Sequence, residues 1–534
     1  MLEGPPTLEP PATSRDAADL ATFGYRQRLD RTLGGFSSFA AGFSYLSILT
    51  GLPQLFYLGF QSGGPAFFWT WPTVFLGQML VACCFAELAA EFPLSGGVYQ
   101  WAKRLGQGSA GWMAGWVSLA CALISMASVA LALQGTLPQI APWFQVVGDG
   151  SNSADAARNA VLLGCGLIIL STLINIAGVR VLSRINNIGV FAELVGASLL
   201  VILLFSASRR GPTVLFDTQG KGLGSPLGYL GPFLMAALTP SFVMYGFDTA
   251  GSLAEETVDP RKRGPRAILG SLAAVGLMGG LLILGALQAA PDLLDPDLGR
   301  MGGGMSSIIK AAIGSTWGRF LLADVALAIV VCTLTVHASA VRLVFAMARD
   351  NDLPWSGALA ALPGSARSPW LPAVLVGLLA VMILGINANS PSVVELLASV
   401  AIVWANLGYL FVTVPQLFRR SGQSNRTETA GQRRSEHQRL FVLGRWGLPI
   451  NVLAVLWSLA VVVNVGWPRP EIYGDPWYRR YASVWATLVL VGLGWIYRGR
   501  ARRRGRPVVL AEHRAFLPNG ALGRAVEVTE ERMR

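Results

Sequence analysis

An apolar stretch near the N-terminus reads Phe43-Ser44-Tyr45-Leu46-Ser47-Ile48-Leu49-Thr50-Gly51-Leu52-Pro53-Gln54. It belongs to a longer segment, from Thr32 to Ala86, that contains no Asp, Glu, Lys, Arg or His. Two membrane-spanning helices of about 20 residues fit in that segment. Pro53 is best placed at the first position of a new helical segment, where its missing N–H costs nothing. We therefore expect a spanning helix that is unwound near Leu49 to Leu52.

A second apolar stretch has the same character and reads Thr239-Pro240-Ser241-Phe242-Val243-Met244-Tyr245-Gly246-Phe247-Asp248-Thr249-Ala250-Gly251. Unwound backbone at membrane depth is tolerated only beside protein or a water-filled cavity. The two stretches hold corresponding positions, first and sixth, in two five-helix halves. That pairing is typical of transporters built from inverted repeats, whose substrate site lies between the breaks. Taken singly, each stretch is also compatible with a simple kink.

The composition supports a membrane protein. Of the 534 residues, 53% are hydrophobic and 13% are charged, about half the roughly 25% charge of soluble domains. A large soluble enzyme is therefore excluded. Stretches poor in charge predict an all-α integral membrane protein with twelve spans: two within 32–86, then 110–137, 159–178, 185–206, 228–252, 266–289, 318–347, two within 368–418, 447–466 and 481–497.

The placement of the basic residues predicts the orientation. Most of the 42 Lys and Arg residues fall in segments that face the cytoplasm if the N-terminus does, which is the positive-inside pattern. The net charge of +12 then reflects topology and contact with anionic membrane lipid, with no nucleic acid as partner. The expected divisions are a cytoplasmic tail (1–30), two five-helix repeats (31–206 and 207–418), a basic cytoplasmic loop (419–446), two C-terminal helices (447–498) and a cytoplasmic tail (499–534).

Several classes of chemistry lack their motifs in this sequence. There is no H-E-x-x-H pair for zinc and no P-loop for ATP, so we expect no metal, no cofactor and no enzyme activity. All five cysteines fall inside predicted helices, which argues against a disulfide framework. No cleavable signal peptide is expected. The preference for Arg over Lys suggests a GC-rich genome, and we expect a bacterial inner membrane.

Four motifs in order along the chain identify a family. They are Gly35-Phe36-Ser37-Ser38-Phe39, Phe92-Pro93-Leu94-Ser95-Gly96-Gly97, Tyr245-Gly246-Phe247-Asp248, and Ala346-Met347-Ala348-Arg349-Asp350. With them the chain resembles the amino acid–polyamine–organocation (APC) transporters, and most of all the branch of amino acid, choline and GABA permeases. The resemblance implies the five-plus-five inverted repeat of the bacterial leucine transporter, followed by two further helices.

The ends of the interrupted helices predict the substrate contacts. A helical segment starting near Leu52 presents free N–H groups and partial positive charge, which suit a carboxylate. We expect Thr50, Gly51 and Leu52 to contact it. Carbonyl groups at the ends of the preceding half-helices suit an ammonium group or a cation, so a zwitterionic amine or amino acid would match both ends.

The second interrupted helix contributes further candidates. Gly246 marks the break, and Asp248 could bind an ammonium group or could cap the helical segment that follows. The resemblance implies that Phe242 and Tyr245 line the pocket, with Phe242 as a gate. Packed or lipid-facing aromatic side chains are the alternative for both.

Glu193 is an acid in the middle of an apolar span, where it costs about 2.5–3.5 kcal/mol on insertion scales. We expect it to couple transport to a proton or cation, with Ser47 and Ser339 as weaker partners. A protonated or hydrogen-bonded structural acid is the alternative. In several relatives a lysine on the fifth helix replaces a sodium ion, and here Glu193 holds that place. Leu49 likewise replaces a glycine of the family's first break.

The sequence therefore predicts a secondary active transporter for amino acids or related small amines, including GABA-like compounds and choline. It would work by alternating access, driven by a proton or sodium gradient or by exchange. A transport-inactive nutrient sensor of the same fold remains open, and a membrane-embedded enzyme is less well supported. Glu255 and Glu256 could pair with Arg342 or Arg349 as an inner gate, with a solvated charge network as the alternative. We expect His337 to be a satisfied contact between helices.

Overall fold

The computed structural model describes residues 12–106, 108–150, 152–300, 303–362, 368–386, 393–423, 440–474, 476–502 and 509–514. Every regular element in these residues is a helix, and the only strand-like pairings are two isolated bridges, Tyr25 with Arg514 and Leu33 with Thr257. The predicted all-α class is confirmed.

Ten helices among the described residues are long and apolar enough to cross a membrane. They are α2 with α3 (Gly35–Leu46 and Ile48–Gly63), α4 (Thr70–Glu91), α6 (Gly108–Leu131), α8 (Ser153–Ala177), α9 (Val179–Ser206), α13 (Pro260–Ala289), α15 (Ser315–Arg349), α18 (Val393–Gln423), α20 (Gly447–Gly466) and α23 (Ala482–Arg502). Shorter apolar helices lie at the sixth and ninth predicted spans: α10 and α11 (Leu230–Ala236 and Leu238–Val243) and α17 (Trp370–Ile386). The chain is thus an integral membrane protein.

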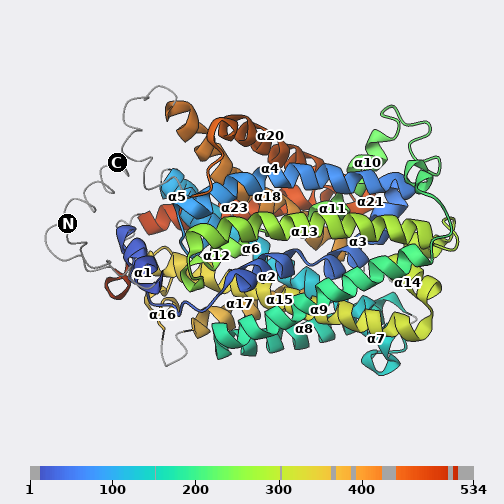
Figure 1. Ribbon diagram of the computed structural model, residues 1–534, viewed down its shortest axis with the longest axis horizontal. Helices are drawn as coiled ribbons and strands as arrows, with labels where there is room; N and C mark the ends of the chain where they lie inside the picture. The colour runs from blue at the N-terminus through green and yellow to red at the C-terminus, as the bar shows by residue number, and fades with distance from the viewer. Residues whose placement is uncertain are drawn as a thin grey trace, which may run out of the picture.

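The helices run roughly along the long axis of the molecule (Figure 1). The most apolar window of α2 and α3 is 78% buried, whereas that of α23 is 17% buried. In a chain that crosses lipid, this contrast separates a central helix from one at the rim. The interrupted first helix is therefore at the centre of the bundle, where unwound backbone can be satisfied by protein.

The first helix is interrupted at Ser47, which lies between α2 and α3 with a positive φ of 28°. The predicted unwinding near Leu49 to Leu52 is wrong, because those residues already form the first turns of α3. Pro53 lies inside α3 and does not begin it. It is tolerated so close to the start of the helix because it forfeits only one early hydrogen bond.

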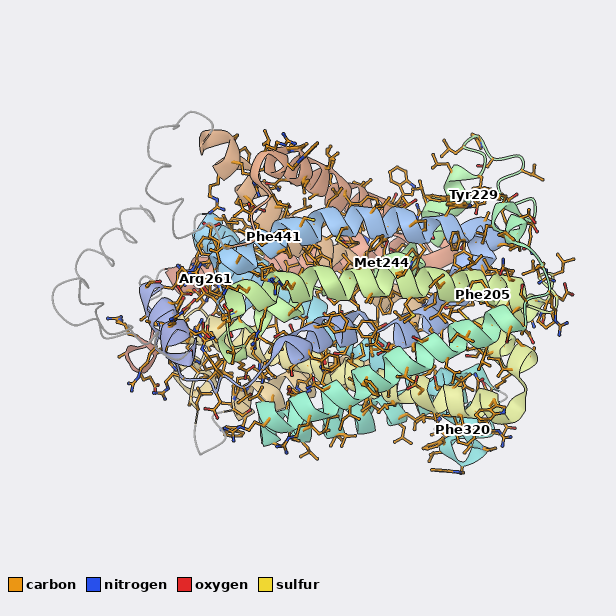
Figure 2. The ribbon with its side chains drawn as sticks, in the orientation of Figure 1. Phe205, Tyr229, Met244, Arg261, Phe320 and Phe441 are labelled. Atoms are coloured by element: carbon orange, nitrogen blue, oxygen red, sulfur yellow. The ribbon has the colours of Figure 1, made fainter. Side chains whose placement is uncertain are left out.

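The sixth helix is interrupted between α11 and α12 (Thr249–Ser252), as predicted. Gly246 has a φ of +93°, which favours glycine, and an added Cβ would lie 2.0 Å from the ring of Tyr45. Met244, which precedes the break, lies midway along the bundle, between Arg261 at one end and Phe205 and Phe320 at the other (Figure 2). The two breaks therefore meet near the middle of the bundle.

One end of the bundle carries the short helices α1 (Ala12–Thr22), α5 (Gly97–Leu105), α12 and α16 (Ser356–Leu359) (Figure 1). The first and last described segments meet there, because Arg26 N–H donates to the carbonyl of His513 over 2.9 Å. We call this end the inner end.

Candidate substrate and ion site

Glu193 lies at the break in the first helix, and its side chain is 1% exposed. Its Oε1 accepts hydrogen bonds from the Ser47 hydroxyl (2.9 Å) and from the Leu49 N–H (3.1 Å). The first N–H groups of a helix carry partial positive charge and suit an anion. An internal carboxylate therefore holds the helix start at which a substrate carboxylate was predicted to bind.

The second carboxyl oxygen of Glu193, Oε2, is buried and has no hydrogen-bond partner. No ion pair involves Glu193 within the part of the chain that the structure describes. Ser47 contacts it as predicted, whereas Ser339 lines a different part of the site. Of the three predicted ion-coupling residues, the structure therefore brings Ser47 and Glu193 together.

Two small cavities lie beside the breaks, and Tyr45 and Tyr245 line both of them. Their rings meet edge to face with centroids 6.1 Å apart, and the Tyr245 hydroxyl lies 2.7 Å from that of Ser125. These two tyrosines therefore separate the two cavities. We call the cavity nearer the inner end the lower cavity and the other one the upper cavity.

The upper cavity is lined by Thr50, Gly51 and Phe242 together with Leu46, Ser125, Val129, Cys332 and Val336. The volume open to the centre of a water molecule is about 10 Å³, roughly what one water needs. Phe242 packs against Tyr245 with ring centroids 5.9 Å apart. A molecule larger than water can therefore enter only if these aromatic side chains move.

The predicted carboxylate contacts are placed as follows. The Thr50 hydroxyl lies 2.6 Å from that of Ser47, and the N–H of Gly51 donates to the Ser47 carbonyl over 3.1 Å. Leu52 is buried and lines neither cavity. The helix starts four residues earlier than predicted, so its free N–H groups belong to residues 48–50.

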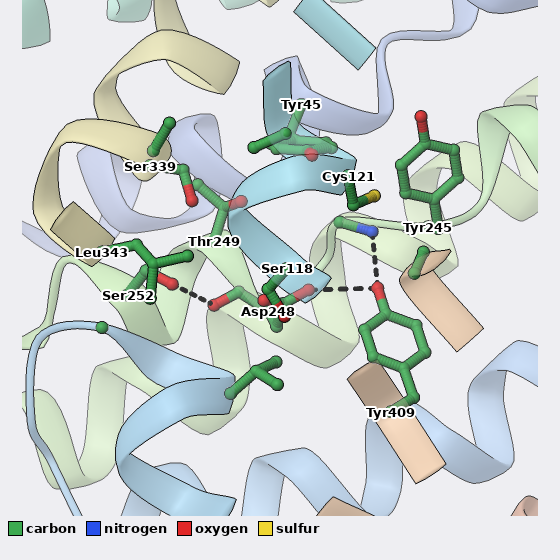
Figure 3. Close-up of a pocket in the computed structure, with 16 residues that line it drawn as sticks. Tyr45, Ser118, Cys121, Tyr245, Asp248, Thr249, Ser252, Ser339, Leu343 and Tyr409 are labelled. Carbon is green, nitrogen blue, oxygen red and sulfur yellow. Dashed lines mark hydrogen bonds between the residues drawn. The ribbon is translucent and has the colours of Figure 1, made fainter. Parts of the chain in front are cut away.

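The lower cavity contains Asp248, Ser339 and Tyr409, with about 40 Å³ open to the centre of a water molecule. Tyr409 accepts a hydrogen bond from Gly246 N–H (2.7 Å) and donates one to Asp248 Oδ1 (3.0 Å), as Figure 3 shows. The predicted capping role of Asp248 is wrong. It stands at the N-cap position of α12, but its side chain makes no capping hydrogen bond.

Ion pairs close the inner end below these cavities. Arg349 forms a two-pronged contact with Glu255 (2.8 and 2.8 Å), and Arg342 forms one with Glu256 (3.1 and 3.0 Å). The four side chains are at most 3% exposed. The predicted pairing is confirmed, and we call these four residues the inner gate.

A second charged cluster adjoins the inner gate. Asp350 accepts hydrogen bonds from Lys103 (2.7 Å) and from the Tyr99 and Tyr25 hydroxyls. Burial alone would raise the pKa of Asp350, but Lys103 and Arg349 outweigh it and hold that pKa below its usual value. Asp350 therefore stays ionised and ties α5 to the end of α15.

Residues 33–493 match the family model described as amino acid permease. The chain belongs to the amino acid permease family. The family was predicted from four short motifs, and the match extends over nearly the whole helical bundle. Membership points to a transporter rather than to an enzyme.

Three relatives illustrate the breadth of the family. The permease is 28% identical to the amino-acid permease BAT1 of Arabidopsis thaliana over 473 residues, 84% of this chain and 88% of that protein. It is 23% identical to amino-acid permease 2 of Neurospora crassa over 510 residues (92% and 89%). It is 23% identical to the GABA-specific permease of Saccharomyces cerevisiae over 412 residues (75% and 71%). These relatives come from a plant and from fungi, so the expected bacterial membrane finds no support in them.

Sequence reasoning missed Tyr45, Ser125 and Tyr409. Tyr45 stands two residues before the true break, so an earlier placement of that break would have found it. Tyr409 is a polar aromatic residue in an apolar span, which is a weak signal. Its hydrogen bonds join α18 to the break in the sixth helix, and sequence spacing does not reveal such a contact. His337 is satisfied as predicted, by Ser171 (2.9 Å) and the carbonyl of Ala373 (3.0 Å).

Proposed function

We propose that this permease is a secondary active transporter that moves amino acids or related small amines by alternating access, coupled to protons through Glu193. One observation carries the proposal. The carboxyl of Glu193, on α9, accepts a hydrogen bond from the first turn of α3, beside the cavity lined by Thr50 and Gly51. An acid at this depth with no cationic partner is stable when it binds a proton during part of the cycle.

Competition for the start of α3 would couple the proton to the substrate. While Glu193 is ionised, its Oε1 accepts from Leu49 N–H and from the Ser47 hydroxyl. Protonation neutralises it and weakens its hold, because charge-assisted hydrogen bonds are about twice as strong as neutral ones. Those donors then become available to a substrate carboxylate that enters beside Thr50 and Gly51. Proton and substrate thus bind together, as symport requires.

Asp248 is the acid that we assign to the amine of the substrate. It lines the lower cavity, and Tyr409 holds one of its oxygens. Movement of Tyr45, Tyr245 and Phe242 would join the two cavities and let one substrate contact both ends. The inner gate is closed in this structure, and its opening would release the substrate toward the inner end.

The architecture that we propose has twelve spans, with two inverted five-helix repeats (31–206 and 207–418) and two additional helices (447–498). Ten long apolar helices and two shorter ones at the predicted positions support it. The meeting of the first and last described segments at the inner end supports termini on one side, which we assign to the cytoplasm.

Reconstitution into proteoliposomes tests the function. We expect uptake of a labelled amino acid to be stimulated by an inward proton gradient and not by a sodium gradient. Glu193→Gln mimics the protonated state, so it should abolish stimulation by the proton gradient and retain exchange of substrate between the two sides. Glu91→Gln, which removes an acid at the inner end of α4, is the control. Fully coupled transport by Glu193→Gln would reject this role. Absence of any transport, with binding retained, would indicate a sensor.

A further inference from the structure

A second acid at membrane depth, Asp324, is not used by the mechanism above. Helix α15 begins at the end of the bundle opposite the inner end, and Asp324 lies nine residues from that start. At 1.5 Å per residue this is roughly 13 Å along the helix. The Oδ2 atom of Asp324 is buried and has no hydrogen-bond partner. An ionisable side chain at this depth is costly and is a functional candidate whose partner must be identified.

The close packing of α9 against α15 places Asp324 beside Gly196. A Cβ on Gly196 would lie 1.8 Å from Oδ2 of Asp324, so any larger residue there would displace the carboxyl from this position. A second contact lies two helical turns away. Gly189, seven residues before Gly196 in α9, contacts Val331, seven residues after Asp324 in α15. The two helices are therefore antiparallel and in register over two turns. Gly196 follows Glu193 by three residues, so Asp324 is about one turn further out than Glu193.

Glu193 is the partner that this register supplies. Its free oxygen, Oε2, is buried without a hydrogen bond, and the two carboxyls interact electrostatically. The other groups around Glu193 include the Ser47 hydroxyl, the N–H groups of Ile48 and Leu49, and the Cys332 thiol. The basic residues of this region, Lys310 on α14 (Met305–Ile313) and Arg319 on α15, carry like charges that repel each other. Arg319 is about a turn and a half further out than Asp324, and no ion pair joins either base to Asp324 within the described residues.

Ionising both carboxyls at the same time carries a high free-energy cost in this position. Like charges in an apolar region repel, and pairs of this kind share protons as a unit. Each acid also has one oxygen with no other partner, which is the atom that a transferred proton requires. The pair thus has the chemistry of a proton relay between the outer end of α15 and the first-helix break.

We propose that Asp324 is the outer member of a two-carboxyl relay that delivers the coupling proton to Glu193. Asp324 first takes a proton from the side of the membrane opposite the inner end. The O–H bond on Asp324 then breaks as an O–H bond forms on Glu193 Oε2, directly or through one water. Asp324 becomes a carboxylate and Glu193 a neutral acid, so one proton is conserved. This inference depends on the proposed role of Glu193.

The experiment compares Asp324→Asn, Glu193→Gln and the wild type in proteoliposomes. Asp324→Asn should slow uptake driven by a proton gradient, and the accompanying proton influx, by about tenfold to a hundredfold, at or below the low end of what a positioned acid contributes. Substrate exchange should stay within about twofold of wild type, because the loaded carrier keeps its proton. Asp155→Asn, at the outer end of α8, is the matched control and should leave both rates unchanged.

Equilibrium binding separates a relay from the coupling site itself. Asp324→Asn should retain the pH dependence of substrate affinity, since Glu193 still titrates at equilibrium, whereas Glu193→Gln should lose it. Wild-type proton flux in Asp324→Asn would overturn the relay and leave the role of Glu193 intact. Sodium-driven uptake without proton movement would overturn both. If Asp324→Asn fails to fold, two other variants take its place. Asp324→Glu retains the acid, and Gly196→Ala displaces the Asp324 carboxyl. The first should keep most of the proton flux, and the second should slow it while substrate binding persists.

Discussion

At the scale of single residues, the backbone conformation of two positions creates the site. Ser47, with a φ of 28°, ends α2 and lets α3 begin with its N–H groups facing Glu193. Gly246, with a φ of +93°, turns the sixth helix toward Tyr45 and Tyr409. A non-glycine residue with positive φ costs roughly 1–2 kcal/mol. Ser47 bears such a cost at the centre of the bundle, where strain often marks function.

We predict that Gly246→Ala destabilises the permease and abolishes transport. The new Cβ would lie 2.0 Å from the Tyr45 ring, and alanine disfavours the positive φ by about 1–2 kcal/mol. The thermal unfolding midpoint in detergent and uptake in proteoliposomes measure these effects. Gly231→Ala is the control, because nothing lies within 4 Å of its added Cβ. Equal behaviour of the two variants would contradict the close approach at Gly246.

At the scale of elements, charged side chains join helices most strongly where they are buried. The inner gate links the segment after α12 to α15 through side chains at most 3% exposed. Glu91 on α4 pairs with Arg419 on α18, but these side chains are 35% and 30% exposed. Removal of one partner from a buried pair costs about 3–5 kcal/mol, because the other charge remains unpaired. An exposed pair contributes about 0–1 kcal/mol.

Two substitutions of the same chemistry should therefore differ in effect. Glu255→Gln removes the counter-charge that is hydrogen-bonded to buried Arg349 and should lower the unfolding midpoint by many degrees. Glu91→Gln should change it little. The same variants should differ in transport, since a weakened inner gate favours the state open to the inner end. Thiol labelling of Cys121, which lines the lower cavity, reports that opening. A similar labelling rate in both variants would contradict a gating role for Glu255.

At the scale of the whole molecule, the first and last described segments both contribute to the inner end. Tyr25 lies under the Arg349 guanidinium, 3.9 Å from the ring centroid, and Leu510 N–H donates to the Arg349 carbonyl over 2.9 Å. His513 is 1% exposed and contacts the carbonyl of Ala360 and the ring of Phe345. If these ion pairs open as we propose, the docking of both segments is disturbed.

Docking of residues 509–514 should depend on pH. Burial lowers the pKa of His513, and Arg349 and Arg28 act in the same direction, while Glu512 opposes them. The undocked histidine, with a pKa near 6.5, binds protons more readily than the docked one. Docking is therefore strongest above about pH 6.5 and weakens as the pH falls below it. Hydrogen exchange of this segment at pH 7.5 and 5.5 measures the change. His513→Gln should remove it, and unaltered pH dependence in that variant would refute the assignment.

The sequence alone determined the class, the family and the place of most helices in this permease. Those properties follow from local composition and short motifs: apolar runs of spanning length, glycine at a break, and family-like motifs such as Tyr245-Gly246-Phe247-Asp248. It also singled out Glu193 and Asp248, because an acid among apolar residues is visible without a fold. The pairing of Glu255 and Glu256 with two arginines was likewise predictable from charge.

Only the tertiary structure decided what those residues contact. The first break is at Ser47 and not at Leu49 to Leu52, because the carboxyl of Glu193, distant in sequence, satisfies the N–H group at the new helix start. Tyr409 reaches Asp248 and Gly246 from another helix, and Gly196 makes room for Asp324. Local propensity sets where a helix can form. Contacts between helices set where it stops and which polar groups meet, and those depend on packing that no single stretch of sequence contains.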